Sequence, residues 1–160
     1  MPNAAPVDYA LLAAQLSSLS EGSVCFLPLL SNCAALLWQS LPDINWAGFY
    51  LLKGDTLYLG PFQGKPACTE IAVGRGVCGA CAASLQPQLV PDVHAFPGHI
   101  ACDSASRSEL VLPILKNGRL LGVMDIDSPC LNRFSEADRQ GLEKLCDLLA
   151  GADWDFFREL

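Results

Sequence analysis

Apolar residues recur at helical spacing in the first quarter of the chain and predict two helices there. Leucines lie on one face of the segment spanning residues 6–19, which is typical of an amphipathic helix. A second apolar segment predicts a helix that ends near Leu41. Pro28 suits the first turn of this helix or a break in it, because proline lacks the backbone N–H that a helix interior needs.

A closing helix is predicted after Phe134. Ser135 and Asp138 have the spacing of an acidic capping box, in which each side chain bonds the backbone N–H of the other residue. The apolar spacing then continues to Leu149 and extends toward Trp154 and Phe157.

The middle of the chain is predicted to form strands with one short helix among them. The predicted strands are residues 45–53, 56–62, 68–73, 88–90, 108–115 and 119–127, the helix is 77–85, and 92–106 is a polar loop. Helices, then strands, then a closing helix indicate an α+β domain, with a central antiparallel sheet packed by the N- and C-terminal helices. We expect residues 1–160 to form one domain.

The composition and net charge exclude several classes of protein. Hydrophobic residues make up 51% of the 160 residues, which supplies a large core and excludes disorder. Ten basic against seventeen acidic residues give a net charge of −7, which argues against nucleic-acid binding. No apolar run is long enough to span a membrane. The first basic residue is Lys53, so no signal peptide is predicted, and we expect a cytoplasmic protein.

The chain contains eight cysteines, which in a reducing compartment are not expected to form a structural disulfide framework. Three of them fall in apolar helical patterns and are interpreted as core residues: Cys25, Cys33 and Cys146. Four others lie among glycine, proline and polar residues, where we expect accessible thiols: Cys68, Cys78, Cys81 and Cys102.

Cys78 and Cys81 form a CxxC motif, which raises the possibility of zinc. A structural zinc site normally has a second ligand pair at comparable spacing. The remaining candidates are His94, His99 and Cys102, and none forms such a pair. No metal site is therefore predicted.

Trp46, Gly48 and Tyr50 alternate along one predicted strand and share a face. Because the residue between the two aromatic side chains is a glycine, we expect a slot with flat walls. The alternative is an ordinary half-buried strand with aromatic core residues.

Three carboxylates are predicted to meet at the end of the last hairpin. Asp125 and Asp127 share one face, and the position of Glu109 depends on the turn. A two-residue turn at Asn117-Gly118 places Glu109 opposite Ile126, on the other face. A three-residue loop places Glu109 opposite Asp125, and this register is our prediction because it gathers all three groups. Solvated strand ends are the alternative interpretation.

Such a cluster cannot stay fully ionised at low cost, so at least one carboxyl group should have a raised pKa and act as a proton donor. The others can bind an ammonium group. Cys102 lies on the loop leading to Glu109. A thiol, a proton donor, an anionic patch and an aromatic slot suit a small cationic substrate with an apolar tail that is attacked by sulfur.

The chain resembles the free methionine-R-sulfoxide reductases, which are single GAF-domain enzymes. The resemblance runs from about Ile44 to the final helix. It rests on these segments: Gly74-Arg75-Gly76-Val77-Cys78-Gly79, Pro91-Asp92-Val93-His94, Pro97-Gly98-His99-Ile100-Ala101-Cys102-Asp103, Ser108-Glu109-Leu110-Val111-Leu112-Pro113-Ile114 and Gly122-Val123-Met124-Asp125-Ile126-Asp127-Ser128.

The resemblance implies reduction of free L-methionine (R)-S-oxide, with no bound cofactor, by a homodimer that thioredoxin recycles. It implies that Cys102 is the nucleophile, Cys68 the resolving thiol and Cys78 an auxiliary thiol. The family's substrate pocket falls on these residues: Trp46, Tyr50, Glu109, Asp125 and Asp127.

The predicted chemistry matches these residue types. Attack by Cys102 on the sulfoxide sulfur, with a proton from a carboxylic acid, leaves a sulfenic acid that Cys68 converts to a disulfide. Charge arguments alone instead favour Cys78 as the reactive thiol, because it follows two glycines near a helix N-terminus. Here the resemblance is preferred.

Two rival functions are a GAF sensor of small molecules and a thiol-based redox sensor. A ligand sensor has no need of three cysteines together. A redox sensor requires neither the aromatic slot nor the carboxylates.

Overall fold

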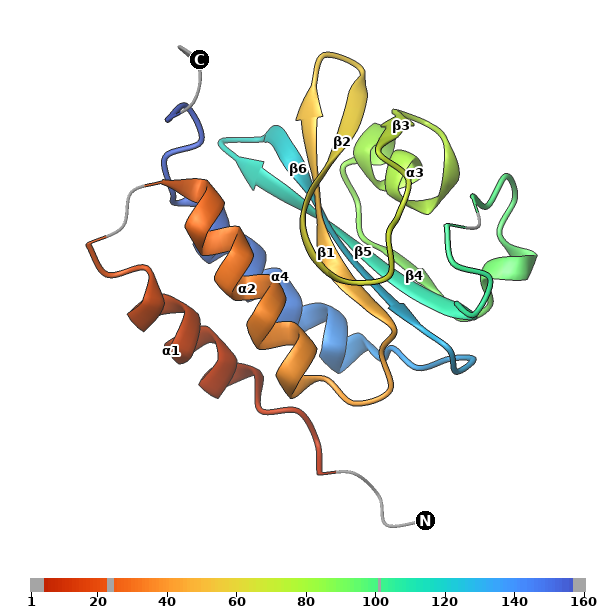
Figure 1. Cartoon of the computed structure of the whole chain (residues 1–160), viewed down its shortest axis with the longest axis horizontal. Coiled ribbons are helices and arrows are strands. Elements are labelled where there is room, and N and C mark those ends of the chain that lie inside the picture. The colour runs from red at the N-terminus through yellow and green to blue at the C-terminus, as the bar shows by residue number, and fades with distance from the viewer. Residues whose placement is uncertain (1–4, 23–24, 101, 157–160) are drawn as a thin grey trace.

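A six-stranded antiparallel sheet with the strand order β3-β2-β1-β6-β5-β4 forms the centre of the molecule (Figure 1). The computed structural model describes residues 5–22, 25–100 and 102–156. The strands are β1 (Trp46–Lys53), β2 (Thr56–Gly64), β3 (Glu70–Ala72), β4 (Gln88–Val90), β5 (Ser108–Lys116) and β6 (Arg119–Ser128). The helices are α1 (Tyr9–Leu19), α2 (Phe26–Ser40), α3 (Gly76–Ser84) and α4 (Glu136–Ala150), with one 3-10 turn, η1, at Val93–Ala95.

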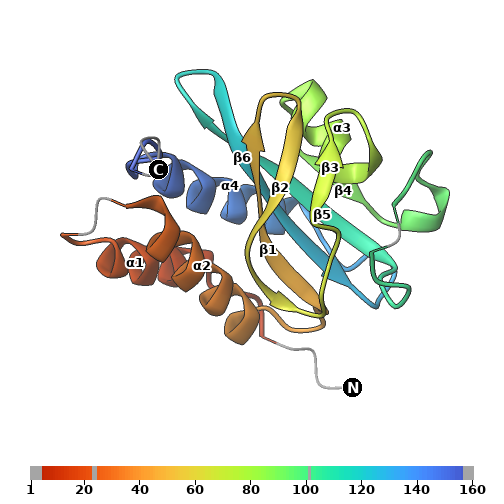
Figure 2. The same cartoon turned by 45° about the horizontal axis from the view of Figure 1, so that its top comes forward.

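Helices α2 and α4 cover one face of the sheet, α1 packs against these two helices, and α3 lies against the other face (Figure 2). The larger core fills the first interface, where Leu30 and Leu37 of α2 are fully buried with Phe49, Leu112 and Ile126 of the sheet. Burial of this apolar surface is the main term that stabilises the fold. The predicted α+β architecture with N- and C-terminal helices against an antiparallel sheet is confirmed.

The helix ends follow the local sequence. Asp8 caps α1 by accepting a hydrogen bond from the N–H of Leu11. Ser135 and Asp138 form the predicted capping box of α4. The prediction that this helix extends to Trp154 is wrong, because it ends at Ala150 with Gly151 as its C-cap. The predicted extension to Phe157 lies outside the described residues.

The last hairpin does not have the predicted register. Asn117 and Gly118 both have positive φ and form a two-residue turn that pairs Lys116 with Arg119. A bulge then shifts the register, because Leu115 pairs with Leu120 but Ile114 pairs with Gly122. The residue left unpaired is Leu121 of β6.

This bulge decides which carboxylates meet. Beyond it Glu109 pairs with Asp127, and Val111 pairs with Asp125. The prediction that Glu109 lies opposite Asp125 is therefore wrong, and so is the three-residue loop. Glu109, Asp125 and Asp127 still share one face, because the extra residue restores the alternation that a two-residue turn alone would have reversed.

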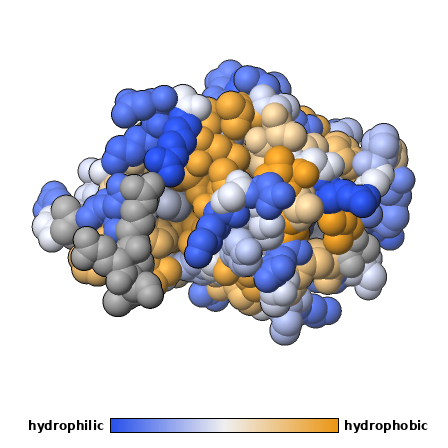
Figure 3. All heavy atoms as spheres, turned by 90° about the horizontal axis from the view of Figure 1, so that it is seen from above, coloured by the Kyte–Doolittle hydropathy of each residue, from blue (hydrophilic) through white to orange (hydrophobic). Residues whose placement is uncertain are grey.

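Apolar side chains also gather on the surface seen in Figure 3. A groove lies near the turn between β1 and β2 and the turn between β5 and β6. Its lining includes Leu52, Leu120, Leu121 and Trp154. It shares no lining residue with the cavity described below.

Within the described residues, no helix combines the length and hydrophobicity that crossing a membrane requires.

Candidate active site

A cavity lies between the sheet and α3, on the face opposite the larger core. β1, β5, β6, α3 and the loop between η1 and β5 all contribute to its lining. The residues of the predicted site that line it are Trp46, Tyr50, Cys78, Cys102, Glu109, Asp125 and Asp127. Cys68 is outside this lining but is bonded to Cys102. The structure therefore brings all eight predicted site residues together.

Two aromatic rings form one wall of the cavity. Trp46 and Tyr50 are buried, with their ring centroids 6.0 Å apart and their planes inclined by 25°. The indole N–H of Trp46 donates a hydrogen bond to the carbonyl of Lys65 at 3.1 Å. The hydroxyl of Tyr50 donates one to the carbonyl of Cys68 at 2.8 Å. The aromatic wall thus also holds the loop that carries Cys68.

Gly48 does not open a slot between these two rings, contrary to our prediction. A Cβ atom at Gly48 would lie only 2.3 Å from the Cβ of Phe62, its partner on β2. The ring of Phe62 stacks on Trp46 with a centroid distance of 5.2 Å. The missing side chain therefore allows close approach of β2, and the flat wall is formed by rings in contact.

Two of the three carboxyl groups are buried, and the third, Asp127, is partly buried. Glu109 and Asp125 are each only 6% exposed. Burial, followed by the charge of Asp125, raises the pKa of Glu109 well above its usual value. Burial and Asp125 likewise raise the pKa of Asp127. Burial raises the pKa of Asp125, while hydrogen bonding from its neighbours opposes that rise. The cluster therefore favours a proton on Glu109 and Asp127, with Asp125 as the most acidic member.

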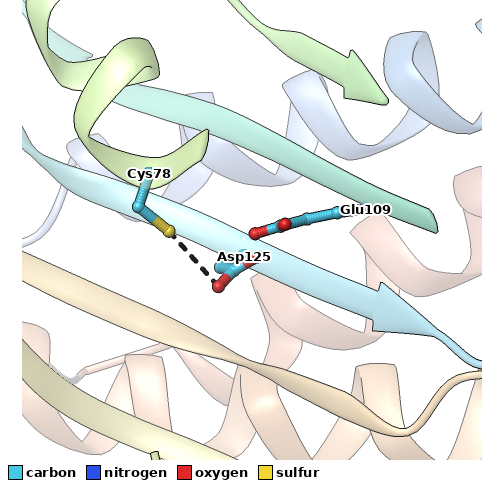
Figure 4. A group of neighbouring side chains, drawn as sticks. All are labelled: Cys78, Glu109 and Asp125. Atoms are coloured by element: carbon cyan, nitrogen blue, oxygen red, sulfur yellow. Dashed lines mark hydrogen bonds between the residues drawn. The ribbon is translucent and has the colours of Figure 1, made fainter. Parts of the chain in front are cut away.

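Cys78 points from α3 toward two of these carboxylates (Figure 4). Its Sγ donates a hydrogen bond to Oδ2 of Asp125 at 3.3 Å. Burial and the charges of Asp125 and Glu109 raise the pKa of this thiol well above 9. Cys78 is buried, so the prediction of an accessible thiol there is wrong. The charge argument for a reactive Cys78 also fails, because burial and the nearby carboxylates outweigh the helix N-terminus.

Cys102 is joined to Cys68 by a disulfide, with Cα atoms 5.8 Å apart and a separation of 34 positions in sequence. The loop after Cys102 is held by Asn45, the residue before β1, because its side-chain amide donates to Asp103 at 3.2 Å and to Ser106 at 3.0 Å. Cys68 and Cys102 thus come from separate loops. The first loop is hydrogen-bonded to Tyr50 of β1, and the second to Asn45, directly before β1.

Two further polar residues line the cavity and were not predicted as site residues. His99 lies with its Nε2 atom 3.8 Å from Oε2 of Glu109. Arg75, the residue before α3, lines the cavity as well. Both lie in the motifs that carry the resemblance, and this is the only signal in the sequence that marks them.

The family model for the GAF domain matches residues 10–152. The chain is also 56% identical, over 137 residues, to the free methionine-R-sulfoxide reductase of Escherichia coli, which covers 86% of this chain and 83% of the relative. The chain belongs to the free methionine-R-sulfoxide reductases.

Other members of this family agree with the assignment. The free methionine-R-sulfoxide reductase of Saccharomyces cerevisiae is 48% identical over 82% of this chain and 77% of its own length. The structure of the Staphylococcus aureus reductase in complex with its substrate is 46% identical and covers 91% of this chain and 95% of that one, with a TM-score of 0.87. The predicted family and GAF fold are confirmed.

The remaining cysteines of this reductase differ in accessibility from two of our expectations. Cys33 and Cys146 are buried in the core as predicted, while Cys25 is only partly buried. Cys81 is fully buried rather than accessible. Cys130 is exposed.

Three residues approach one another closely enough to hold a metal ion: Cys78, Glu109 and Asp125.

Proposed function

We propose that this protein reduces free L-methionine (R)-S-oxide to L-methionine by thiol chemistry. The observation that supports this best is the disulfide between Cys68 and Cys102, which lies at a cavity lined by buried carboxyl groups and two aromatic rings. Relatives with about half of their residues identical are named as reductases of this substrate.

The first step is attack by the Cys102 thiolate on the sulfoxide sulfur. A carboxylic acid of raised pKa, Glu109 or Asp127, donates its proton to the sulfoxide oxygen. The oxygen passes to Cys102, which becomes a sulfenic acid as methionine leaves. The sulfur of the substrate is thereby reduced by two electrons and the cysteine sulfur is oxidised by two.

The second step closes the disulfide. The Cys68 sulfur attacks the sulfenic acid of Cys102, and the oxygen leaves as water with the proton of the Cys68 thiol. The hydrogen bond from Tyr50 to the carbonyl of Cys68 supports this role, because it keeps the resolving loop beside the aromatic wall. Cys78 serves as an auxiliary group through its hydrogen bond to Asp125.

The reductant in this proposal is the dithiol of thioredoxin, which reopens the disulfide by thiol exchange. Both electrons pass through the cysteine pair, so the reaction needs no bound cofactor. We expect the protein to act as a homodimer.

Binding of the substrate divides between the two halves of the cavity. The S-methyl group packs against Trp46 and Tyr50, which offer apolar surface. The carboxyl groups of Glu109 and Asp127 surround the sulfoxide oxygen. An ionised Asp125 attracts the ammonium group of the free amino acid.

The test is methionine release from the separate R and S sulfoxides of free methionine, with thioredoxin, thioredoxin reductase and NADPH. We expect turnover with the free R epimer only. A peptide that contains methionine sulfoxide serves as a second substrate and is expected to remain unreduced. Absence of turnover with the R epimer would contradict the proposal and favour a GAF sensor of small molecules.

A further inference from the structure

The charges that line the cavity are distributed very unevenly. Its carboxyl groups come from the loop after Cys102 and from two neighbouring strands: Asp103, Glu109, Asp125 and Asp127. Among the lining residues that the structure describes, Arg75 is the only arginine or lysine. It lies at the start of α3 and is exposed, whereas Glu109 and Asp125 lie deep in the cavity.

The second basic side chain of the lining does not supply a competing positive charge. Burial lowers the pKa of His99 below 6.5, and the charge of His94 acts in the same direction. The imidazole is therefore mainly neutral at pH 7. Arg75 keeps its charge throughout the physiological range.

This distribution orients a zwitterion. A free amino acid carries an ammonium and a carboxylate on one carbon atom, and the carboxylate is repelled by ionised carboxyl groups at the base of the cavity. The favourable orientation places the ammonium toward the acidic residues and the carboxylate at the guanidinium.

Resting on the proposed function, we propose that Arg75 binds the α-carboxylate of the substrate and selects the free amino acid over methionine sulfoxide within a peptide. The guanidinium offers two parallel N–H donors that match a carboxylate. A methionine sulfoxide residue inside a chain has neither terminal charge, so neither Arg75 nor an ionised Asp125 attracts it. Specificity then arises from a difference in binding to one end of the substrate.

The experiment combines a change in the protein with a change in the ligand. Arg75→Gln and wild type are each assayed with free L-methionine (R)-S-oxide and with its carboxamide, which lacks the negative charge. Arg107→Gln is the matched control, because Arg107 is an exposed arginine on the loop before β5 that does not line the cavity.

We expect Arg75→Gln to raise KM for the free acid about 10-fold, the size of one charge-assisted hydrogen bond, with little change in kcat. Wild type should discriminate against the carboxamide by a similar factor, and Arg75→Gln should lose that discrimination. Arg107→Gln should behave as wild type with both ligands.

Two results would overturn the assignment. One is an unchanged KM of Arg75→Gln for the free acid. The other is an equal loss with acid and carboxamide, which would mean that Arg75 supports the loop and does not bind the carboxylate. Failure of the wild-type protein to reduce the free acid would instead refute the proposed function, and the role of Arg75 with it.

Discussion

The Sγ atom of Cys78 donates a hydrogen bond to Oδ2 of Asp125 over 3.3 Å, and both side chains are buried between α3 and the sheet. A thiol in this arrangement stabilises the ionised form of its neighbour. It also makes its own ionisation costly, since a thiolate would lie against a carboxylate in a poorly solvated space. Cys78 therefore acts as a hydrogen-bond donor in the folded protein, whereas Cys102 is exposed.

The same contact predicts that Cys78 is chemically inert. After reduction, we expect iodoacetamide at pH 8 to modify the exposed Cys130 at least ~10-fold faster than Cys78, because the thiolate is the nucleophile. Mass spectrometry of peptides at increasing times measures both rates. Unfolding in urea should equalise them, and modification of Cys78 before Cys130 in the folded protein would contradict this prediction.

The cysteine pair predicts two distinct failures. Cys102→Ser should release no methionine, because the nucleophile is lost. Cys68→Ser should release one methionine per chain and then stop, even when thioredoxin is present. The sulfenic acid on Cys102 then has no resolving thiol. Quantified methionine release and dimedone labelling of Cys102 distinguish these states.

The exposed Cys130→Ser is the control and should turn over as wild type. A double variant, Cys68→Ser with Cys78→Ser, tests whether Cys78 substitutes for the resolving thiol. Continued thioredoxin-dependent turnover by this double variant would refute the assignment of Cys68.

Burial of Glu109 predicts a loss of stability as pH rises. The folded-state pKa of Glu109 lies well above its unfolded value near 4.5, so the folded protein binds more protons between these two pKa values. The stabilising contribution is complete below about pH 4.5. It is lost as the pH rises toward the folded pKa.

Glu109→Gln keeps the shape of the side chain and removes this titration. Its free energy of unfolding should exceed that of wild type by about 1 kcal/mol or more at pH 8, and by less at pH 4. Urea unfolding at several pH values measures the difference. Glu70→Gln, at an exposed position of β3, should follow the wild-type curve. A constant difference between Glu109→Gln and wild type at all pH values would contradict the prediction.

Local sequence patterns were sufficient to predict most helices and strands. They failed where the structure depends on contacts between residues far apart in the sequence. The capping box of Ser135 is written in a few neighbouring residues and was found. The bulge at Leu121 was not predicted, although Gly122 follows it directly. A glycine inside a strand indicates a bulge or a close backbone approach and does not say which residue is left unpaired. The environment of Cys78 could not be predicted from its neighbours in sequence, because Asp125, which accepts its hydrogen bond, is 47 positions away.

The close approach at Gly48 predicts that even a methyl group is harmful. Gly48→Ala places a Cβ atom 2.3 Å from that of Phe62 and should destabilise the protein by about 1–3 kcal/mol. Activity should fall as well, because β2 and the ring that stacks on Trp46 must shift. Urea unfolding measures the loss. Gly151→Ala, at the end of α4 with φ of −73°, is the control and should stay near wild type.

Deleting the bulged residue tests how the carboxylates are aligned. Removal of Leu121 converts the hairpin into a regular ladder in which Lys116 still pairs with Arg119 and Glu109 still pairs with Asp127. Because the alternation of faces depends on these pairs, the deletion should retain the site and most of the activity. Leu121→Ala controls for loss of the partly buried side chain. If the deletion abolished methionine release while Leu121→Ala remained active, the bulge itself, and not the pairing it permits, would be what positions Asp125 and Asp127.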